Sequence, residues 1–328
     1  MNEIVTILSL LSQAVLNLNT LVLLLRLLMR NCIMKYSIIN HNCLNVLREK
    51  TIHQTIDLTF LDPPFNQNKE YAYHDDNMSE AAYWDMMSEV CQATFDLTAP
   101  GGSIYFMQRE KNTEYVLSCL RKTGWCLQNL IIWKKKTSAV PVASKYGKHY
   151  QIIAYATKGE KAKTFHRLRI EPPLPPNYKQ QRENGVFLTD VWDDIRELTS
   201  GYFAGEEALR TVHGERAHKQ QAPIALLLRI ILSSTQVGDW IFDPFAGTGT
   251  TLCVAHQLNR HSIGIEIDPQ NAALIHSRLD EIREADSLQK HYHDYRCTED
   301  LSKIWGSSSA APAPKKNSSS GQVGLFDL

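Results

Sequence analysis

Four consecutive residues, Asp62-Pro63-Pro64-Phe65, could hold a flat base that carries an exocyclic amine. The apolar run from Ile56 to Leu61 predicts a buried parallel strand, and the prolines that follow cannot continue its ladder. A carboxylate, a carbonyl and an aromatic ring are therefore expected at the carboxyl end of a strand, where open α/β sheets bind ligands. Asp62 and the Pro63 carbonyl can each accept one amine hydrogen, and Phe65 can stack on the ring.

A second candidate site lies far downstream, in a strand, a glycine turn and the start of a helix. The stretch from Trp240 to Thr251 is expected to form a strand, a glycine turn and a helix start, and Gly247 and Gly249 in the turn allow the backbone to approach a ligand closely. About twenty residues further on, a second strand, Ser262–Ile265, ends in Glu266. An acid at this position suits the hydroxyls of a ribose, so the pair of strands predicts a nucleotide-like cofactor.

Both stretches resemble motifs of the amino DNA methyltransferases, which methylate adenine N6 or cytosine N4. Asp62-Pro63-Pro64-Phe65 resembles motif IV, which implies that these four residues form the catalytic site. The glycine turn resembles motif I, and Glu266 falls at motif II. The resemblance implies S-adenosylmethionine as the cofactor, with contacts from Asp243, Phe245, Gly247, Gly249, Thr250 and Glu266.

A third stretch resembles motif X of the same enzymes, whose usual form is His-Pro-Thr-Gln-Lys-Pro. His218, Gln221 and Pro223 match this form, whereas Lys219 replaces the usual proline and Ala222 the usual lysine. The resemblance implies that His218, Lys219 and Gln221 lie at the cofactor. Lys219 would substitute for the missing lysine at the carboxylate of the cofactor.

The order of these motifs, IV before X and I, resembles the β class of the family. It implies an α/β fold with a doubly wound, mostly parallel, Rossmann-like sheet that is circularly permuted and carries a small target-recognition insertion. We expect five regions: an apolar N-terminal extension (1–33), a catalytic half (34–159), a target-recognition region (160–215), a cofactor-binding half (216–300) and a disordered tail (301–328).

The charge distribution favours a double-stranded DNA partner, although the net charge of the 328-residue chain is zero. Between Lys134 and Arg182, twelve basic residues stand against two acidic ones, and such a block suits phosphate contacts. The seven cysteines show no metal-binding spacing, which indicates reduced thiols, a cytoplasmic location and no metal site.

The two ends of the chain carry separate predictions. Residues 4–29 are very apolar but contain polar interruptions, and an over-extended start, a docked amphipathic helix and a membrane anchor all stay open. We do not expect a membrane partner. Near the other end, Gln322, Leu325 and Phe326 resemble a peptide that binds the bacterial sliding clamp, and a tail folded back onto the body is the alternative. A homodimer also stays open.

The favoured function is transfer of a methyl group to a flipped base in DNA, with adenine N6 preferred because an acid opens motif IV. Cytosine N4 is the alternative. RNA and protein glutamine methyltransferases share a Pro-Pro-aromatic motif, but usually have motif I first and asparagine in place of Asp62. A non-catalytic DNA-binding module would need neither Asp62 nor Glu266.

Overall fold

An eight-stranded sheet forms the centre of the computed structural model, which describes residues 35–67, 76–137, 143–171, 184–198, 205–210 and 221–306. The strand order is β1-β10-β9-β2-β3-β5-β4-β8, and β5 is antiparallel to its neighbours β3 and β4 while the other pairs are parallel. Its strands are β1 (Tyr36–Asn40), β2 (Ile56–Leu61), β3 (Thr98–Arg109), β4 (Cys126–Lys134), β5 (Tyr150–Thr157), β8 (Val191–Trp192), β9 (Trp240–Asp243) and β10 (His261–Glu266).

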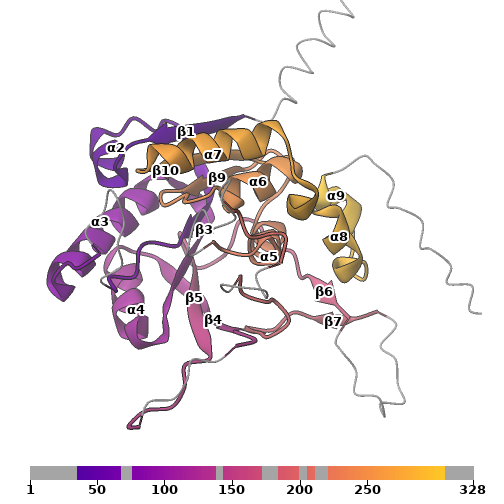
Figure 1. Ribbon diagram of the computed structural model, residues 1–328, viewed down its shortest axis with the longest axis horizontal. Coiled ribbons are helices and arrows are strands. Elements are labelled where there is room, and N and C mark those ends of the chain that lie inside the picture. Colours follow the sequence, from indigo (N-terminus) through magenta and orange to yellow (C-terminus); the bar gives the residue numbers. More distant parts are fainter. Residues whose placement is uncertain are drawn as a thin grey trace, which may run out of the picture.

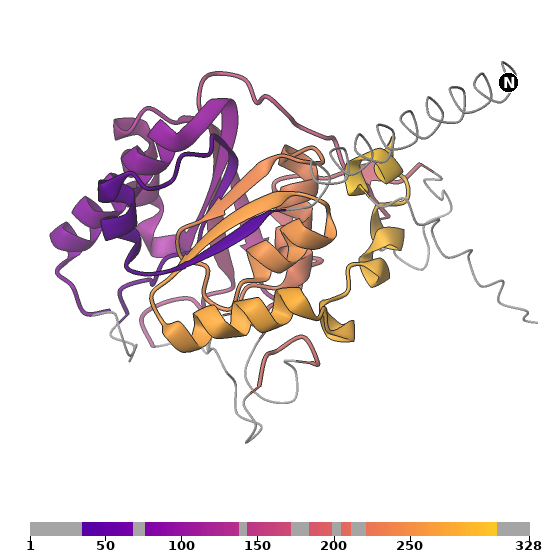
Figure 2. The ribbon, with the colours of Figure 1, turned by 90° about the horizontal axis from the view of Figure 1, so that it is seen from above.

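Helices cover both faces of this sheet, as Figure 1 and Figure 2 show. One face carries α2 (Cys43–Glu49), α3 (Glu80–Leu97) and α4 (Thr113–Lys122), and the other carries α5 (Ile224–Ser234), α6 (Thr250–Gln257) and α7 (Pro269–Asp280). Short elements complete the described chain: η1 (Glu110–Asn112), β6 (Arg169–Ile170), β7 (Val186–Phe187), η3 (Glu284–Asp286), α8 (Gln289–Tyr292), η4 (His293–Tyr295) and α9 (Leu301–Trp305).

Two large apolar cores, one on each face, explain why the strands have continuous apolar sequences, and a smaller apolar cluster lies between α6, α7 and β1. Phe60 and Tyr105 pack in the core that contains α5, whereas Ile104 and Phe106 pack in the core beneath α3 and α4. Strands buried on both faces need apolar residues at successive positions. The doubly wound, mostly parallel sheet predicted from the sequence is therefore confirmed.

The circular permutation is visible in the strand order. β9 comes late in the chain but lies at the centre of the sheet, between β10 and β2, while β1 lies at one edge beside β10. The strands β2 and β9 run parallel, with Leu58 opposite Ile241 and Thr59 opposite Phe242. The residues that follow these two strands therefore emerge at the same edge of the sheet, which we call the carboxyl edge.

The predicted start of the tail at residue 301 was wrong, since Trp305 of α9 is 1% exposed and packs in the core with α5. Two local features also shape the sheet and its helices. The segment Pro100-Gly101-Gly102 lies inside β3, where the register with β2 shifts. The α7 helix ends at Asp280, and the next residue is extended (φ −138°).

The target-recognition region is also less separate than its predicted boundaries imply. Its strand β8 pairs with β4 in the central sheet, and only β6 and β7, among the described residues, form a sheet of their own. Within the described ranges, none of the helices is both long and apolar enough to span a membrane. The apolar stretch 4–29 lies outside the described residues.

Candidate active site at the carboxyl edge of the sheet

Two buried side chains, one from α3 and one from β3, hold the motif IV turn in place through hydrogen bonds. The Tyr83 hydroxyl of α3 donates to the Pro64 carbonyl at 2.8 Å, and the Gln108 side-chain amide of β3 donates to that hydroxyl at 2.9 Å. Both side chains are buried, and burial raises the pKa of Tyr83, so its hydroxyl remains a donor. These bonds fix the turn that carries Asp62, which is itself partly exposed at the end of β2.

A second set of hydrogen bonds joins the residues just after the turn to residues 76–78, at the start of the segment that leads into α3. Asn66 adopts a left-handed conformation (φ 50°), and its side chain accepts from the Met78 amide at 2.8 Å and donates to the Met78 carbonyl at 2.7 Å. The Gln67 amide donates to Asp76 at 2.9 Å. The intervening loop, including Tyr71 and Tyr73, lies outside the described residues. Phe65 is 4% exposed, so its predicted stacking requires that the ring be uncovered when a base enters.

The glycine turn after β9 is organised by Asp243. This carboxyl group is 3% exposed and accepts from the Thr251 hydroxyl at 2.5 Å and from the Phe245 amide at 3.0 Å. Burial raises the pKa of Asp243 to about 7. Gly249 has a φ of 76°, and a Cβ atom there would lie 2.7 Å from Ile275, so no other residue fits without strain.

Glu266 connects the ends of β9 and β10. One carboxylate oxygen accepts from the Gly247 amide at 2.7 Å, and the other accepts from the Asp268 amide at 2.9 Å. Burial raises the pKa of Glu266, and these amide bonds oppose that change. Each carboxylate oxygen has a further lone pair, so Glu266 can hold the glycine turn and still accept from ribose hydroxyls.

Motif X is only partly described. Gln221 is 6% exposed, and its side-chain oxygen accepts from the Leu209 amide at 3.0 Å while its nitrogen donates to the Glu207 carbonyl at 3.1 Å. Gln221 therefore holds the segment 205–210, and no cofactor contact of its amide follows from these bonds. His218 and Lys219 lie outside the described residues.

The predicted residues of motif IV, of the glycine turn and of motif II come together at the carboxyl edge. Because Thr59 lies opposite Phe242 on parallel strands, Asp62 and Phe245 occupy equivalent positions just past that edge. Glu266, at the end of β10, accepts a hydrogen bond from the Gly247 amide in the glycine turn that follows β9. A base held at Asp62 and a methyl donor held at Gly247 would therefore be neighbours. The described residues contain no group of His, Cys, Asp and Glu side chains suited to a metal ion.

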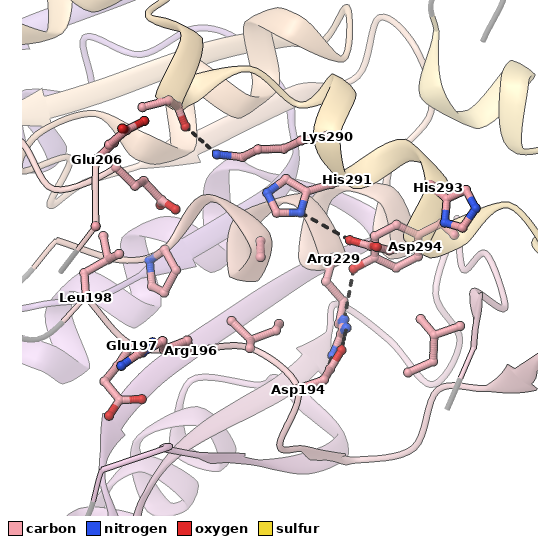
Figure 3. Close-up of a pocket in the computed structure, with 18 of the residues that line it drawn as sticks. Asp194, Arg196, Glu197, Leu198, Glu206, Arg229, Lys290, His291, His293 and Asp294 are labelled. Atoms are coloured by element: carbon pink, nitrogen blue, oxygen red, sulfur yellow. Dashed lines mark hydrogen bonds and ion pairs between the residues drawn. The ribbon is translucent and has the colours of Figure 1, made fainter. Parts of the chain in front are cut away.

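A cavity of about 800 Å³, to whose lining many charged residues contribute, adjoins this edge on the α5 side (Figure 3). Arg229 of α5, 2% exposed, donates to both oxygens of Asp194 at 2.9 and 2.5 Å and to the Tyr295 hydroxyl at 3.2 Å. The sequence predictions missed these residues. A single arginine inside the apolar helix Ile224–Ser234 was the available signal, since such a cation needs a buried partner.

The basic stretch is divided between two edges of the sheet. Its first part, which includes Lys134, Lys136 and Lys148, is exposed and lies at the carboxyl edge, near the end of β4 and the start of β5. At the opposite edge, Lys158 donates to the Phe95 and Thr98 carbonyls, and Lys163 forms an ion pair with Asp57 at 2.6 Å. One continuous basic surface does not form among the described residues, and only the first part lies beside the motif IV turn.

The strand order and the two turns define an α/β methyltransferase whose acceptor is an amine. A sequence model of the N6/N4 DNA methylase family matches residues 56–277. The chain therefore belongs to this family of DNA methylases, and the predicted amino DNA methyltransferase that uses S-adenosylmethionine is confirmed at the level of the family.

Individual relatives agree with this assignment. The chain is 30% identical over 250 residues to the type II methyltransferase M.HpaI of Haemophilus parainfluenzae, covering 76% of this chain and 75% of that protein. It is 30% identical over 246 residues to the DNA adenine methyltransferase YhdJ of Escherichia coli (strain K12), covering 69% and 77%.

Solved structures share the fold at lower identity. PvuII DNA methyltransferase (cytosine-N4-specific) matches with a TM-score of 0.56 and 19% identity, covering 83% of this chain and 94% of that one. TTHA0409 of Thermus thermophilus, complexed with S-adenosyl-L-methionine, matches with a TM-score of 0.50 and 22% identity, covering 75% and 93%.

Proposed function

We propose that this protein is a cytoplasmic, site-specific DNA methyltransferase that transfers a methyl group from S-adenosylmethionine to adenine N6 of a flipped base. The observation that carries the proposal is the parallel pairing of β2 with β9, which brings Asp62 and the glycine turn to one edge. Adenine is supported by the acid that opens motif IV and by the name of the relative YhdJ.

Asp62 and its neighbours would orient the target amine. Asp62 accepts one amine hydrogen and the Pro63 carbonyl accepts the other, so the nitrogen lone pair points out of the base plane toward the methyl donor. S-adenosylmethionine supplies a methyl group on a positively charged sulfur. When bound, the cofactor would give up this methyl group to the amine, so that a nitrogen–carbon bond would replace the carbon–sulfur bond. Asp62 stabilises the positive charge that develops on the amine, and the proton released from it passes to Asp62 or to water.

The rigid turn contributes through alignment. Tyr83 and Gln108 hold the Pro64 carbonyl, so the two acceptors for the amine are already in place before a base arrives. Orientation of this kind removes much of the entropic barrier to a direct transfer. The base itself has to leave the duplex, because its amine is otherwise paired.

The cofactor would be held by the residues around the glycine turn. Glu266 accepts from the ribose hydroxyls while it holds the Gly247 amide, and Asp243 keeps the turn in shape through Thr251 and the Phe245 amide. The exposed lysines beside β4 would contact DNA phosphates. His218 and Lys219 retain their proposed contacts to the cofactor carboxylate, which the described residues do not test.

We also propose two protein partners, a sliding clamp and a second copy of this chain, and the clamp-binding residues lie outside the described residues. Gln322, Leu325 and Phe326 would bind a sliding clamp, and surface plasmon resonance with immobilised clamp should show binding that Leu325→Ala and Phe326→Ala together abolish. A homodimer would be detected by sedimentation equilibrium.

The experiment that tests the reaction uses cofactor with a labelled methyl group and duplex DNA, RNA or protein as substrate. The proposal expects label in DNA only. Digestion of that DNA to nucleosides and mass spectrometry should find N6-methyladenine, whereas N4-methylcytosine would support the alternative acceptor. Label in RNA or protein alone would contradict the proposal.

A further inference from the structure

Asp286, which follows α7 in the short helix η3, carries a fully buried carboxylate that two arginines share. The residue is 0% exposed. Its oxygens accept from Arg278 of α7 at 3.2 and 3.0 Å and from Arg283 at 2.7 Å each. Burial opposes ionisation, but the hydrogen bonds from Arg283 and the charge of Arg278 lower the pKa of Asp286. An ionised carboxylate therefore joins two guanidinium groups.

Arg278 connects this carboxylate to the glycine turn. The arginine is 2% exposed, and its second terminal nitrogen donates to the Thr248 carbonyl at 2.6 Å. Thr248 lies between Gly247 and Gly249, the two glycines of the turn. Because a guanidinium group is planar and its donors have a fixed geometry, Asp286 and Arg278 together set the position of the turn.

Arg283 connects the same carboxylate to motif X. Its side chain is 34% exposed, and one terminal nitrogen also donates to the Glu207 carbonyl at 3.0 Å. That carbonyl accepts a second bond from the Gln221 side-chain amide at 3.1 Å. The Glu207 carboxylate accepts from the Ile224 amide at the start of α5 at 2.5 Å. Arg283 therefore reaches the described part of motif X through Glu207.

A continuous chain of hydrogen bonds thus runs from the glycine turn to motif X. Its members, in order, are Thr248, Arg278, Asp286, Arg283, Glu207 and Gln221. We call Arg278, Asp286 and Arg283 the Asp286 cluster. The two segments that it joins are separated in the chain by α5 and β9. Charge-assisted hydrogen bonds are strong, so the cluster limits how far the two segments can move apart.

We propose that the Asp286 cluster positions the glycine turn and motif X relative to each other, so that one cofactor molecule contacts both. The inference rests on the proposed cofactor contacts of these two segments. In that proposal, Glu266 beside the glycine turn holds the ribose, and motif X holds the carboxylate of the methionine part. Two contacts made by one ligand strengthen each other only when their separation matches the ligand. The cluster acts through the turn and through Glu207, so its members are positioning residues.

Arg283→Met gives the direct test, with Kd values measured by calorimetry on the full-length protein. S-adenosylhomocysteine carries both the nucleoside and the amino-acid carboxylate, whereas methylthioadenosine lacks the amino-acid part. The Kd for S-adenosylhomocysteine should rise by about tenfold and that for methylthioadenosine by less than about twofold, because only the first ligand links the two segments. A loss of general structure would raise both values. An equal rise for both ligands, or no rise for either, would overturn the proposal.

Two further variants separate geometry from charge. Arg283→Lys keeps the positive charge but replaces the planar fork with one nitrogen, so it should show the same selective rise. A Kd equal to that of the natural protein would refute the positioning role. Arg48 is the matched control, because it makes the same kind of two-bond pair, with Glu89 at 2.5 and 2.7 Å, on the opposite face of the sheet. Arg48→Met should change neither Kd, and a selective rise there would contradict the assignment.

Arg278→Met tests the connection to the glycine turn and should raise the Kd for both ligands, because Arg278 holds the turn itself. An unchanged Kd for methylthioadenosine in the folded variant would contradict that connection. If this variant does not fold, the variants of the partly exposed Arg283 decide the proposal. A natural protein that binds neither ligand would remove the proposed cofactor and this inference together. Binding of both by the natural protein, with an unchanged ratio of Kd values in Arg283→Met, would remove this inference alone.

Discussion

At the scale of single residues, the buried acids of the cofactor half differ from the acid at the base site. Asp243 and Glu266 both accept backbone amides, and burial raises the pKa of each. Through these hydrogen bonds the two carboxyl groups fix the backbone of the glycine turn. Asp62 is partly exposed, as a group that must meet a substrate has to be. Asp243 and Glu266 therefore stabilise the structure of the turn, whereas we propose that Asp62 takes part in the reaction.

The pKa of Asp243 predicts an unusual pH dependence of stability. Its folded value of about 7 exceeds an unfolded value of about 3.9, so the folded state retains a proton that the unfolded state has lost. The free energy of unfolding should fall as pH rises through this window. Asp243→Asn does not titrate, and its stability relative to the natural protein should increase from about pH 5 to about pH 8 in urea titrations. A difference that does not vary with pH would contradict the assignment.

Glu266→Ala should weaken cofactor binding more than it slows the transfer step. Loss of the ribose contact and of the Gly247 bond should raise the Kd for S-adenosylmethionine by about tenfold or more, or about 1.4 kcal/mol. Isothermal titration calorimetry measures this directly. Glu281→Ala, which removes an exposed acid just beyond α7, is the control and should have no effect. An unchanged Kd in Glu266→Ala would exclude the ribose role.

At the scale of elements, the helix α3 and the strand β3 together position the motif IV turn, which follows β2. The bonds from Gln108 to Tyr83 and from Tyr83 to the Pro64 carbonyl join a helix, a strand and the motif IV turn. The sequence could not reveal this because Tyr83 looks like any apolar position of an amphipathic helix. Only the packing of α3 on the sheet brings its hydroxyl to the turn.

Tyr83→Phe should therefore lose both stability and rate. The substitution removes the hydroxyl that the Gln108 amide and the Pro64 carbonyl both bond, and leaving such buried groups unsatisfied costs about 1–3 kcal/mol. The kcat should fall because the turn that carries Asp62 is no longer fixed. Tyr115→Phe is the matched control, since that hydroxyl bonds Glu80 at the surface. Equal unfolding free energies and equal kcat for the two variants would argue against the role of Tyr83.

At the scale of the whole molecule, an ion pair between a buried arginine and a partly exposed aspartate joins the two halves of the enzyme. Asp194 follows β8 on the catalytic side, and Arg229 belongs to the helix that precedes the cofactor strands. The arginine side chain is 3% exposed, whereas that of Asp194 is 36% exposed. The two partners should therefore respond differently to removal.

Asp194→Ala should destabilise the protein more than Arg229→Met does. The first change leaves a buried guanidinium without its carboxylate, which costs about 3–5 kcal/mol. The second removes the cation and leaves a carboxylate that water can reach. Urea denaturation of both variants gives their free energies of unfolding. A larger loss in Arg229→Met would contradict the prediction that the unpaired buried guanidinium is the costlier of the two defects.

Much of the fold and of the site could be predicted from the sequence, for identifiable reasons. Apolar runs that end in Asp62 or in the glycine turn identify parallel strands, and motif order predicts the permutation. Long-range partners could not be predicted. Glu197 is one acid among several in a segment without periodicity, and its bonds to Lys136 and Thr137 exist only because β8 pairs with β4. The division of the basic stretch between two edges likewise depends on the antiparallel β5.

Asp62→Ala gives the most direct test of the central claim that Asp62 and the glycine turn form one site for methyl transfer. Methyl transfer to duplex DNA and cofactor affinity should be measured on the same folded preparation. Transfer should fall to background while the Kd for S-adenosylmethionine stays within about tenfold, or about 1.4 kcal/mol. Appreciable turnover by this variant would show that the amine is held elsewhere and would contradict the assignment of the site.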